Sequence, residues 1–504
     1  MGDSYDFVIV GAGSAGCVLA GLLSADPDAT VLLLEAGGSD ERPQIRETSR
    51  WAENIGSDVD WNYRTVRQRH AGDRRIAWPR GRVLGGSSSI NSMVHLRGAR
   101  SDFDGWARLG NPGWAYADVL PAFRELEDFP GGDPRYRGTG GPLKVRLPRE
   151  HSPHAVAFLE SALAAGHSYN DDFNGASLEG AGWNQLTAVA GRRHSSGDAF
   201  LHPARERPNL TVKTQARARR LVIDGSGRVT AVEYESAGRI LSAGVGAEAL
   251  VSAGTIESPK LLLLSGIGPS AELAAVGIGC LLDLPGVGRN LHDHPGVPLT
   301  WGVRRPVPLS RYQHSEVGLF CRTDPALDSP DLQFGVLSVA LTADGAVSPD
   351  PAYSLYPCLL RPRSRGSLRL RSADPADEPL IDPNYLESPD DVDALVRAIE
   401  VSRGLATGAG LREWTGEEIL PGPDTDLRSY VARTANTWFH PVGTCRMGAD
   451  SSAVVDPSLR VRGTANLRVI DASVIPEIPS ANTNAATLMI AWRAAEMIKN
   501  THCH

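Results

Sequence analysis

Near its start the chain reads Asp6-Phe-Val-Ile-Val10, then Gly11-Ala-Gly-Ser-Ala-Gly16, then Cys17-Val-Leu-Ala-Gly-Leu-Leu23. The first run is apolar and β-branched, which predicts a buried strand, and the third run predicts a buried helix. Residues 30–35, Thr-Val-Leu-Leu-Leu-Glu, predict a second strand. Strand, glycine turn, helix and strand form a βαβ unit, because parallel strands need a crossover connection.

Gly11, Gly13 and Gly16 give the pattern G-x-G-x-x-G between the expected strand and helix. The first glycine permits the tight turn, the second lets the backbone approach a pyrophosphate, and the third lets helix and strand pack closely. Glu35 ends the second strand, where an acid accepts hydrogen bonds from a ribose diol. This carboxylate would repel the 2′-phosphate of NADP, but it does not separate FAD from NAD.

The bulk properties of the chain narrow its class. At 504 residues it exceeds the ~250–300 residues that one hydrophobic core serves, so we expect two domains. The net charge of −8 is the opposite of the basic surplus typical of nucleic-acid binders. No run approaches the ~18 apolar residues of a membrane span, and no secretory signal precedes the first strand. Six scattered cysteines without a C-x-x-C motif favour free thiols in a reducing compartment, so we predict a cytoplasmic protein.

Strand patterns continue through the middle of the chain. Residues 209–213, 218–224 and 229–235 predict a small antiparallel meander, and residues 248–254 predict a further buried strand. Residues 299–374 alternate strand-like runs with Pro, Ser and Asp breaks, which predicts an antiparallel sheet in a second domain.

Several long motifs follow one another along the chain, and each occurs once. They are Gly81-Arg-Val-Leu-Gly-Gly-Ser-Ser-Ser-Ile-Asn-Ser-Met-Val94, Gly254-Thr-Ile-Glu-Ser-Pro-Lys-Leu-Leu-Leu-Leu-Ser-Gly-Ile-Gly268, Gly286-Val-Gly-Arg-Asn-Leu-His-Asp-His-Pro295, His440-Pro-Val-Gly-Thr-Cys-Arg-Met-Gly448, Val469-Ile-Asp-Ala-Ser-Val-Ile-Pro476 and Asn482-Thr-Asn-Ala-Ala-Thr487. Together these segments resemble the signatures of the glucose–methanol–choline (GMC) family of flavoprotein oxidoreductases. The resemblance covers nearly the whole chain and is weakest between residues 299 and 434.

The resemblance implies a fold that combines α/β and α+β parts. A Rossmann-like FAD-binding domain is expected from residues 1–155, 190–297 and 440–504. An inserted substrate-binding domain, built mainly on an antiparallel sheet, is expected from residues 156–189 and 298–439. The substrate cleft would lie beneath that sheet.

The resemblance also implies FAD bound in an elongated pose. The residues expected to contact it are Gly11, Gly13, Ser14, Ala15, Gly16, Glu35, Ala36, Arg82, Val83, Gly85, Gly86, Ser87, Asn91, Met93, Val94, Ala218, Asp471, Ala472, Asn482 and Thr483. Some choline-oxidising relatives carry a histidine in the serine-rich loop that bonds covalently to the flavin. Ile90 stands at that position here, so we expect a non-covalent flavin.

Alcohol oxidation requires a base, and histidine is the usual choice because its pKa lies near neutrality. His440 stands in a segment similar to the family's catalytic segment and is the expected base. Asn484 occupies the position where the family places a second His or Asn, and its amide can hold the substrate oxygen. A helix N-cap is the alternative role for Asn484, because Asn is a favoured cap.

Trp438, Phe439 and His95 are the residues expected at the substrate pocket. His95 stands where relatives mostly show an aromatic residue, so it either replaces that residue in packing or reaches the flavin edge. His292 and His294 are interpreted as structural residues, and we expect no metal site. Gly335 lies in a stretch where choline-directed relatives often carry His, which disfavours choline. The expected substrate is a small neutral primary alcohol, such as an aromatic one.

The expected function is FAD-dependent oxidation of a primary alcohol to an aldehyde, with electrons passing to O2 or a quinone-type acceptor. The alternative from the same fold is an FAD-containing lyase that cleaves hydroxynitriles without net redox change. A plain NAD-dependent Rossmann dehydrogenase would leave the middle and C-terminal motifs unexplained.

Overall fold

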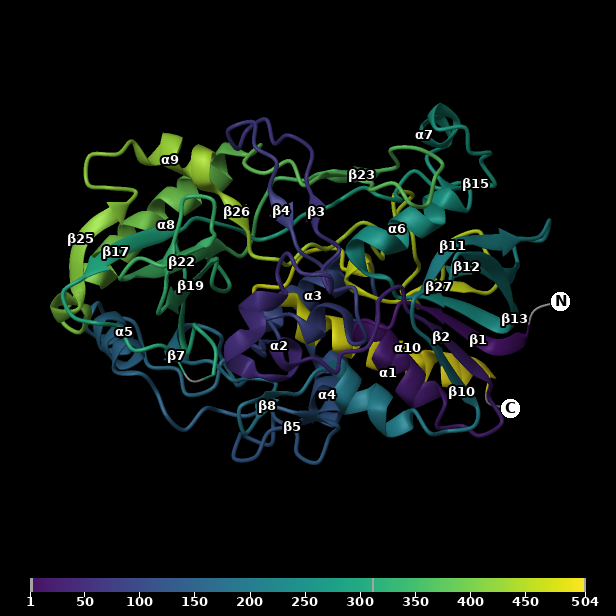
Figure 1. The fold of residues 1–504 in the computed structure, drawn as a ribbon, viewed down its shortest axis with the longest axis horizontal. Helices are drawn as coiled ribbons and strands as arrows, with labels where there is room; N and C mark the ends of the chain where they lie inside the picture. The colour runs from purple at the N-terminus through teal and green to yellow at the C-terminus, as the bar shows by residue number, and fades with distance from the viewer. Residues whose placement is uncertain (1–2, 311, 503–504) are drawn as a thin grey trace.

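The computed structural model describes residues 3–310 and 312–502. The molecule is elongated, with one sheet towards each end of its long axis and both chain termini at the same end (Figure 1). The sheet near the termini carries the glycine turn, and the other belongs to the substrate side.

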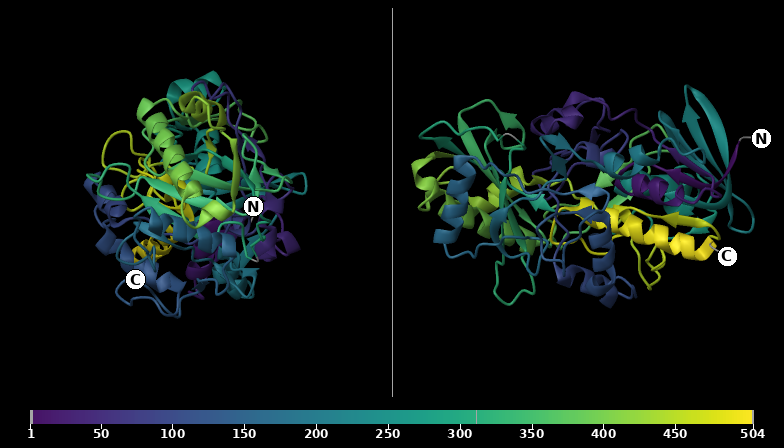
Figure 2. Two further views of the ribbon diagram at one scale, coloured as in Figure 1. Left: turned by 90° about the vertical axis from the view of Figure 1, so that its left-hand side faces the viewer. Right: turned by 90° about the horizontal axis from the view of Figure 1, so that it is seen from below.

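The first sheet has the strand order β10-β2-β1-β13-β12-β11, and β27 pairs with β13. Its strands are β1 (Ser4–Val10), β2 (Val31–Leu34), β10 (Leu210–Lys213), β11 (Ala216–Ile223), β12 (Val229–Ser236), β13 (Arg239–Val251) and β27 (Leu467–Val469). The pairs among β10, β2, β1, β13 and β27 are parallel, which confirms the βαβ start. Helices α1 (Ser14–Leu23) and α10 (Thr483–His502) pack side by side beneath this sheet (Figure 2).

The antiparallel meander differs from the one expected. Residues 210–213 form β10, which pairs in parallel with β2 and not with its sequence neighbour. The meander consists of β11, β12 and the first half of the 13-residue strand β13. Since β13 changes partners halfway, its second half runs between β1 and β27. It ends at Val251, which pairs with Val10 just before the glycine turn.

The second sheet is antiparallel, with the order β25-β17-β22-β19-β18-β7. Its strands are β7 (Gly180–Trp183), β17 (Leu299–Val303), β18 (Val317–Cys321), β19 (Leu332–Leu337), β22 (Ala352–Leu359) and β25 (Thr415–Leu420), extended by β16 (Pro295–Gly296) and β26 (Asn436–Thr437). Helices α5 (Pro153–Ala164) and α8 (Pro389–Thr407) pack against this sheet. Successive side chains of a strand alternate between its faces, and Gln333, Gly335 and Leu337 of β19 line the central cavity.

Two segments lie differently from the expected domain limits. Helix α5 begins at Pro153 and packs on the second sheet, so a boundary after residue 155 would cut it. The hairpin β23 (Ser367–Arg369)–β24 (Leu380–Asp382) packs against α6 (Gly254–Leu264) of the first domain, although residues 298–439 were assigned to the second. Leu368 and Ile381 are fully buried there, and this apolar contact explains the placement.

The remaining elements connect the two sheets and cover their edges. They are α2 (Pro43–Arg46), α3 (Arg100–Arg108), α4 (Tyr116–Leu126), α7 (Ser270–Ala275), α9 (Leu427–Thr434), β3 (Tyr63–Arg64), β4 (Ala77–Trp78), β5 (Glu127–Asp128), β6 (Leu143–Lys144), β8 (Ala188–Val189), β9 (Arg192–Arg193), β14 (Ile267–Gly268), β15 (Leu282–Asp283), β20 (Ala340–Leu341) and β21 (Val347–Ser348).

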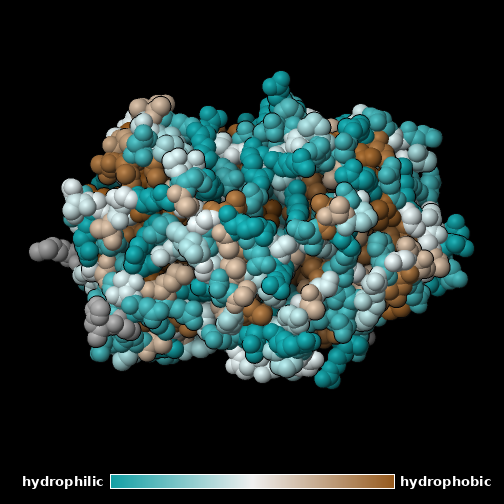
Figure 3. All heavy atoms as spheres, turned by 180° about the vertical axis from the view of Figure 1, so that it is seen from behind, coloured by the Kyte–Doolittle hydropathy of each residue, from teal (hydrophilic) through white to brown (hydrophobic). Residues whose placement is uncertain are grey.

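The face seen in Figure 3 is mainly hydrophilic, with apolar areas that are small and separate. Among the described residues, no helix combines the length and the apolar character that crossing a membrane would require.

Candidate active site

A cavity of about 810 Å³ lies between the two sheets and takes residues from both. It runs from the glycine turn at the end of β1 to the segment that carries His440. Most of the residues predicted for the cofactor line it: Gly11, Gly13, Ser14, Ala15, Glu35, Ala36, Gly86, Ser87, Asn91, Met93, Val94, Ala218, Asp471, Ala472, Asn482 and Thr483. Trp438, Phe439, His440 and Asn484 line it as well, whereas Gly16, Arg82, Val83, Gly85 and His95 do not.

The glycine turn and the serine-rich loop meet at the cavity wall. A Cβ atom on Gly16 would overlap the carbonyl oxygen of Gly11, so only glycine allows α1 to start this close to β1. Gly86 adopts φ 54°, and a Cβ there would lie 2.6 Å from the Cα of Gly13. The two loops therefore bring bare backbone together at the N-terminus of α1, where N–H groups can face a pyrophosphate.

Glu35 lies at the carboxyl end of β2 and is 6% exposed. Its carboxylate accepts hydrogen bonds from the backbone N–H of Ala12 at 2.8 Å and of Gly37 at 2.7 Å. Burial raises the pKa of Glu35 to about 7 against the pull of these two donors. Each carboxylate oxygen keeps a lone pair for a further donor, which is the chemistry that binding of a ribose diol requires.

A buried arginine that was not foreseen holds the serine-rich loop. Arg193 donates to the carbonyls of Ser88 and Asn91 and to the Asn91 side chain, at 2.7–3.0 Å. Burial lowers its pKa to about 9. The same Asn91 oxygen accepts from the backbone N–H of Met93, which adopts φ 64°. In the sequence, Arg192-Arg193 looks like any surface pair, because nothing local reveals its burial.

Asp471 follows β27 and anchors two neighbouring turns. Its carboxylate accepts hydrogen bonds from the backbone N–H of Ser473 at 2.8 Å and of Gly254 at 2.9 Å, and from the Ser258 hydroxyl at 2.6 Å. Burial raises the pKa of Asp471, and these donors act against that shift. The contacts fix Ala472 and the start of α6 at the cavity wall.

His440 is 7% exposed and lies just after β26. Its backbone N–H donates to Asp293 at 2.7 Å, its Nδ1 lies 2.9 Å from Nδ1 of His294, and its Nε2 lies 3.0 Å from Nδ2 of Asn482. Burial lowers the pKa of His440 well below its ordinary value. The ring is therefore neutral near pH 7, as a general base must be before it accepts a proton.

The expected roles of two asparagines differ from their positions in the structure. Asn482, predicted to contact the cofactor, is the residue next to His440. Asn484, predicted to be the catalytic partner, accepts a hydrogen bond from the Ser14 hydroxyl at 2.7 Å and so connects α10 to α1. Because α10 begins at Thr483, one asparagine precedes the helix and the other belongs to its first turn. Their side chains consequently point to different partners.

The substrate end of the cavity has an aromatic wall. The rings of Trp438 and Tyr356 lie 5.3 Å apart with an angle of 32° between their planes. Gly335 leaves space beside them, because a Cβ there would come within 3.5 Å of the Trp438 ring. Phe439 is 37% exposed at the rim, where Arg80 donates to its carbonyl oxygen at 2.8 Å.

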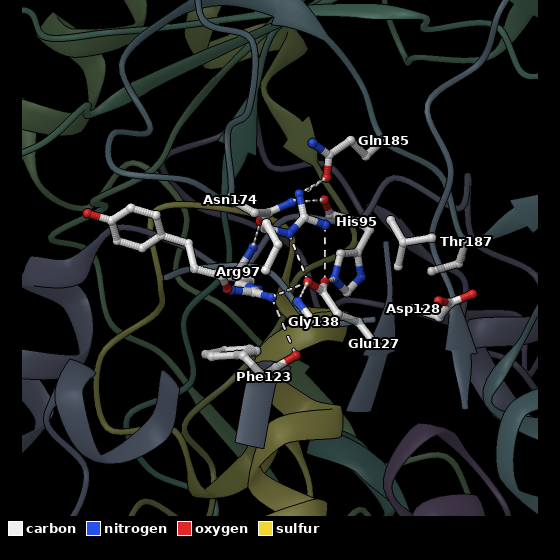
Figure 4. Close-up of polar contacts among 12 residues, drawn as sticks. His95, Arg97, Phe123, Glu127, Asp128, Gly138, Asn174, Gln185 and Thr187 are labelled. Carbon is white, nitrogen blue, oxygen red and sulfur yellow. Dashed lines mark hydrogen bonds and ion pairs between the residues drawn. The ribbon is translucent and has the colours of Figure 1, made fainter. Parts of the chain in front are cut away.

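His95 lies outside the cavity, contrary to its expected place in the substrate pocket. It belongs to a buried polar cluster in which Arg97, Arg137 and His95 surround Glu127 (Figure 4). Burial opposes ionisation of Glu127, but its contacts with His95 and the two arginines prevail and hold its pKa below the usual range. A buried carboxylate surrounded by donors fixes the position of His95, so this residue packs and supports the loop that precedes it.

One trio among the described residues has metal-ligand geometry: Asp40, Glu41 and His202. Arg46 already contacts two of its members, with Nη2 at 3.2 Å from Asp40 and 2.6 Å from Glu41. The guanidinium of Arg46 thus supplies the positive charge that a metal ion would otherwise bring to these two carboxylates.

Family models agree with the geometry. A model described as GMC oxidoreductase matches residues 5–296 with its N-terminal part and residues 362–491 with its C-terminal part. The chain is a GMC oxidoreductase. The prediction from the signature motifs is confirmed.

Relatives and solved structures extend this likeness over the whole chain. An alcohol dehydrogenase [acceptor] of Pseudomonas putida is 39% identical over 98% of this chain and 95% of its own length. Mitochondrial choline dehydrogenase of Homo sapiens is 39% identical over 99% of this chain and 90% of its own length. The crystal structure of pyridoxine 4-oxidase from Mesorbium loti superposes with a TM-score of 0.96 at 38% identity, covering 99% of this chain and 100% of that one.

FAD is the cofactor of this GMC oxidoreductase, and the cavity suits it. The bare backbone of Gly13 and Gly86, the N-terminus of α1 and the carboxylate of Glu35 lie along one wall, where they would contact its pyrophosphate and ribose. The chain is an enzyme of the alcohol oxidase and dehydrogenase type.

The affinity for FAD should depend on pH through Glu35. Ribose hydroxyls donate to the ionised carboxylate, so bound FAD lowers a pKa that lies at about 7 without it. Affinity is therefore expected to rise as the pH increases through about 7 and to level off above it. Titrating apoprotein into FAD and following flavin fluorescence at each pH measures this. The control is Glu35→Gln, whose amide does not titrate, and an unchanged pH dependence in that variant would contradict the assignment.

Proposed function

We propose that this GMC oxidoreductase oxidises a primary alcohol to an aldehyde, with His440 as base and Asn482 holding the substrate oxygen. The observation that carries the proposal is the pair His440–Asn482, 3.0 Å apart, at the end of the cavity opposite Glu35. Relatives named as alcohol dehydrogenase, choline dehydrogenase and pyridoxine 4-oxidase support it.

The residues divide the work of the reaction between them. Nε2 of the neutral His440 accepts the hydroxyl proton of the alcohol. Nδ2 of Asn482 donates to the same oxygen and stabilises the alkoxide charge that develops as the proton leaves. Bound flavin supplies the acceptor for the hydride that leaves the carbon. Burial of His440 excludes water, so both interactions act in a medium of low dielectric.

Backbone restraint keeps the base in place during this transfer. Asp293 accepts from the His440 N–H at 2.7 Å and from the Thr437 hydroxyl at 2.5 Å, and it also accepts from the Tyr385 hydroxyl. Burial raises the pKa of Asp293, while these hydrogen bonds oppose the shift. The catalytic segment is thus fixed at two points, the side chain of Thr437 and the backbone N–H of His440.

The substrate end of the cavity favours a neutral molecule. Among the described residues, those of the second domain that line the cavity carry no Asp, Glu, Lys or Arg. Burial lowers the pKa of His314, the one other histidine on that side, so this ring is neutral too. Trp438 and Tyr356 offer flat apolar faces, which suit an aryl or heteroaryl ring. The substrate class we propose is a small neutral primary alcohol with an aromatic ring.

The flavin is proposed to be non-covalent. Ile90, at the position where covalent relatives have histidine, is 6% exposed and lines the cavity without a nucleophilic atom. His95 faces Glu127 and not the cavity. Acid precipitation of the holoenzyme should therefore release all of the flavin into the supernatant.

The reaction class can be read from the visible spectrum in an anaerobic cuvette. We expect a neutral arylmethanol to bleach the flavin band, and choline at equal concentration to reduce it far more slowly, because the described second-domain residues that line the cavity offer its cation no carboxylate. Return of the band in air would indicate an oxidase, and persistence of bleaching would indicate another acceptor such as a quinone. Absence of bleaching with every alcohol would reject the oxidation and favour the hydroxynitrile-lyase alternative.

His440→Ala should lower the rate of flavin reduction by at least ~10²-fold, since general base catalysis contributes that much. FAD should remain bound, because the glycine turn and Glu35 are untouched. Stopped-flow reduction at saturating alcohol measures the rate, and the flavin-to-protein absorbance ratio provides the control. A wild-type rate in this variant would eliminate His440 as the base.

Asn482 and Asn484 form a matched pair for testing which asparagine is the catalytic partner. Asn482→Ala should reduce the limiting rate of flavin reduction by ~10²-fold or more, as the loss of a donor to a developing oxyanion does. Asn484→Ala should leave that rate nearly unchanged and weaken the α1–α10 contact, which thermal unfolding would report as a lower midpoint. The reverse pattern would restore Asn484 as the catalytic partner.

A further inference from the structure

The segment His292-Asp293-His294 runs alongside the catalytic segment, just before β16. His292 is fixed by its surroundings: its Nδ1 donates to the Asn290 carbonyl at 2.6 Å and its Nε2 accepts from the Ile478 N–H at 3.0 Å. Asp293 binds the His440 backbone. His294 makes the remaining contact, directly to the ring of the base.

The rings of His294 and His440 meet through like atoms. Their Nδ1 atoms lie 2.9 Å apart, and their planes are nearly perpendicular at 89°. Burial lowers the pKa of His294 to about 3 and that of His440 well below its ordinary value, so both rings are neutral. A neutral imidazole has one N–H donor and one bare nitrogen. One ring must therefore donate across this contact and the other accept.

The amide of Asn482 decides which ring donates. Gln333 Nε2 donates to Asn482 Oδ1 at 3.4 Å, so Asn482 presents its NH2 group to Nε2 of His440. That nitrogen is then bare, and the single proton of His440 is on Nδ1, where it donates to His294. His294 in turn keeps its own proton on Nε2. The backbone carbonyls of Leu360 and Pro479 favour a proton on this ring.

The opposite arrangement of protons conflicts with these contacts. It would place an N–H on Nε2 of His440, facing the NH2 group of Asn482. Nε2 of His294 is buried and has no hydrogen-bond partner whichever ring donates, so the contact between His440 and Asn482 is what decides. Two donors facing each other leave both N–H groups unsatisfied, and each buried polar atom without a partner costs ~1–3 kcal/mol. The network therefore selects one tautomer of His440.

We propose that His294 is a positioning residue that holds His440 as its Nδ1–H tautomer and so keeps Nε2 bare towards the substrate. The role rests on the proposed alcohol oxidation. When the O–H bond breaks, the proton bonds to Nε2, while the Nδ1 proton stays and its hydrogen bond to His294 becomes charge-assisted. Charge-assisted hydrogen bonds are roughly twice as strong as neutral ones. The contact thus stabilises the imidazolium more than the resting base.

Other charged and titratable groups around His440 do not replace this acceptor. Asp293 is engaged by the backbone N–H of His440 and by two hydroxyls. Arg80 is cationic and opposes a positive charge on His440. Among the described residues, His294 is the hydrogen-bond partner that the structure gives to Nδ1.

The test compares His294→Leu with the similarly sized His294→Asn. Leucine removes the acceptor, and the limiting rate of flavin reduction should fall by at least ~10²-fold, since a catalytic histidine in the wrong tautomer loses more than that. Asparagine places Oδ1 near the former Nδ1 and should stay within about tenfold of wild type. The acid limb of kcat/KM should shift to lower pH in the leucine variant only, because its imidazolium lacks the acceptor.

The tautomer itself is measurable apart from turnover. In holoenzyme labelled with 15N-histidine, resonances absent from His440→Ala identify His440. Wild type should show a protonated-type Nδ1 and a bare-type Nε2, His294→Asn the same, and His294→Leu a mixture of both forms.

The outcomes separate this inference from the proposed function. No bleaching of wild type by alcohols would overturn the function, while the nitrogen spectra would still decide the tautomer. Equal rates, equal pH limbs and equal spectra in the leucine variant and wild type would overturn the positioning role. A rate loss that follows only lost FAD, with the pH limb unmoved, would also overturn it.

Discussion

The active site depends on a buried carboxylate that requires hydrogen-bond donors. Asp293 cannot remain unpaired in a low-dielectric interior, and it is satisfied by Thr437, Tyr385 and the backbone of His440. Two of those donors belong to the segment 437–440, and Tyr385 comes from a distant part of the chain. Satisfying one charge therefore places the catalytic segment against the wall of the second sheet and gives His440 its orientation. The exact position of the base follows from this requirement more than from any local preference for secondary structure.

The cavity exists because the chain passes repeatedly between two sheets. The first sheet contributes the glycine turn and Glu35, which we expect to bind diphosphate and ribose. The second contributes Gln333 and the aromatic wall, and neither sheet alone encloses the cavity. His440 lies at the junction, with Asn482 from the turn before α10. In the proposed function, cofactor and substrate are thus recognised by different domains, and the proton is transferred where the domains meet.

Sequence reasoning succeeded where the physics is local. The glycine turn, the parallel start and the antiparallel second sheet all follow from short patterns of apolar residues and steric limits. It is less informative where a long-range partner decides the geometry. Asn482 precedes α10 and lies beside His440, while Asn484 lies in the first turn and contacts Ser14, and no local signal fixes where the helix begins. Likewise, Arg193 and His95 look ordinary in the chain, since only the fold reveals their buried partners.

Burial at the site has two effects that must be weighed together. It lowers the pKa of His440, which keeps the base neutral but weakens it as a proton acceptor. It also strengthens each hydrogen bond to the charges that form during transfer. A site with Asn482 alone would stabilise the alkoxide and leave the new imidazolium unsupported. The contact with His294 supplies that second stabilisation without a carboxylate, so His440 and its ring partner are both neutral before the proton is transferred.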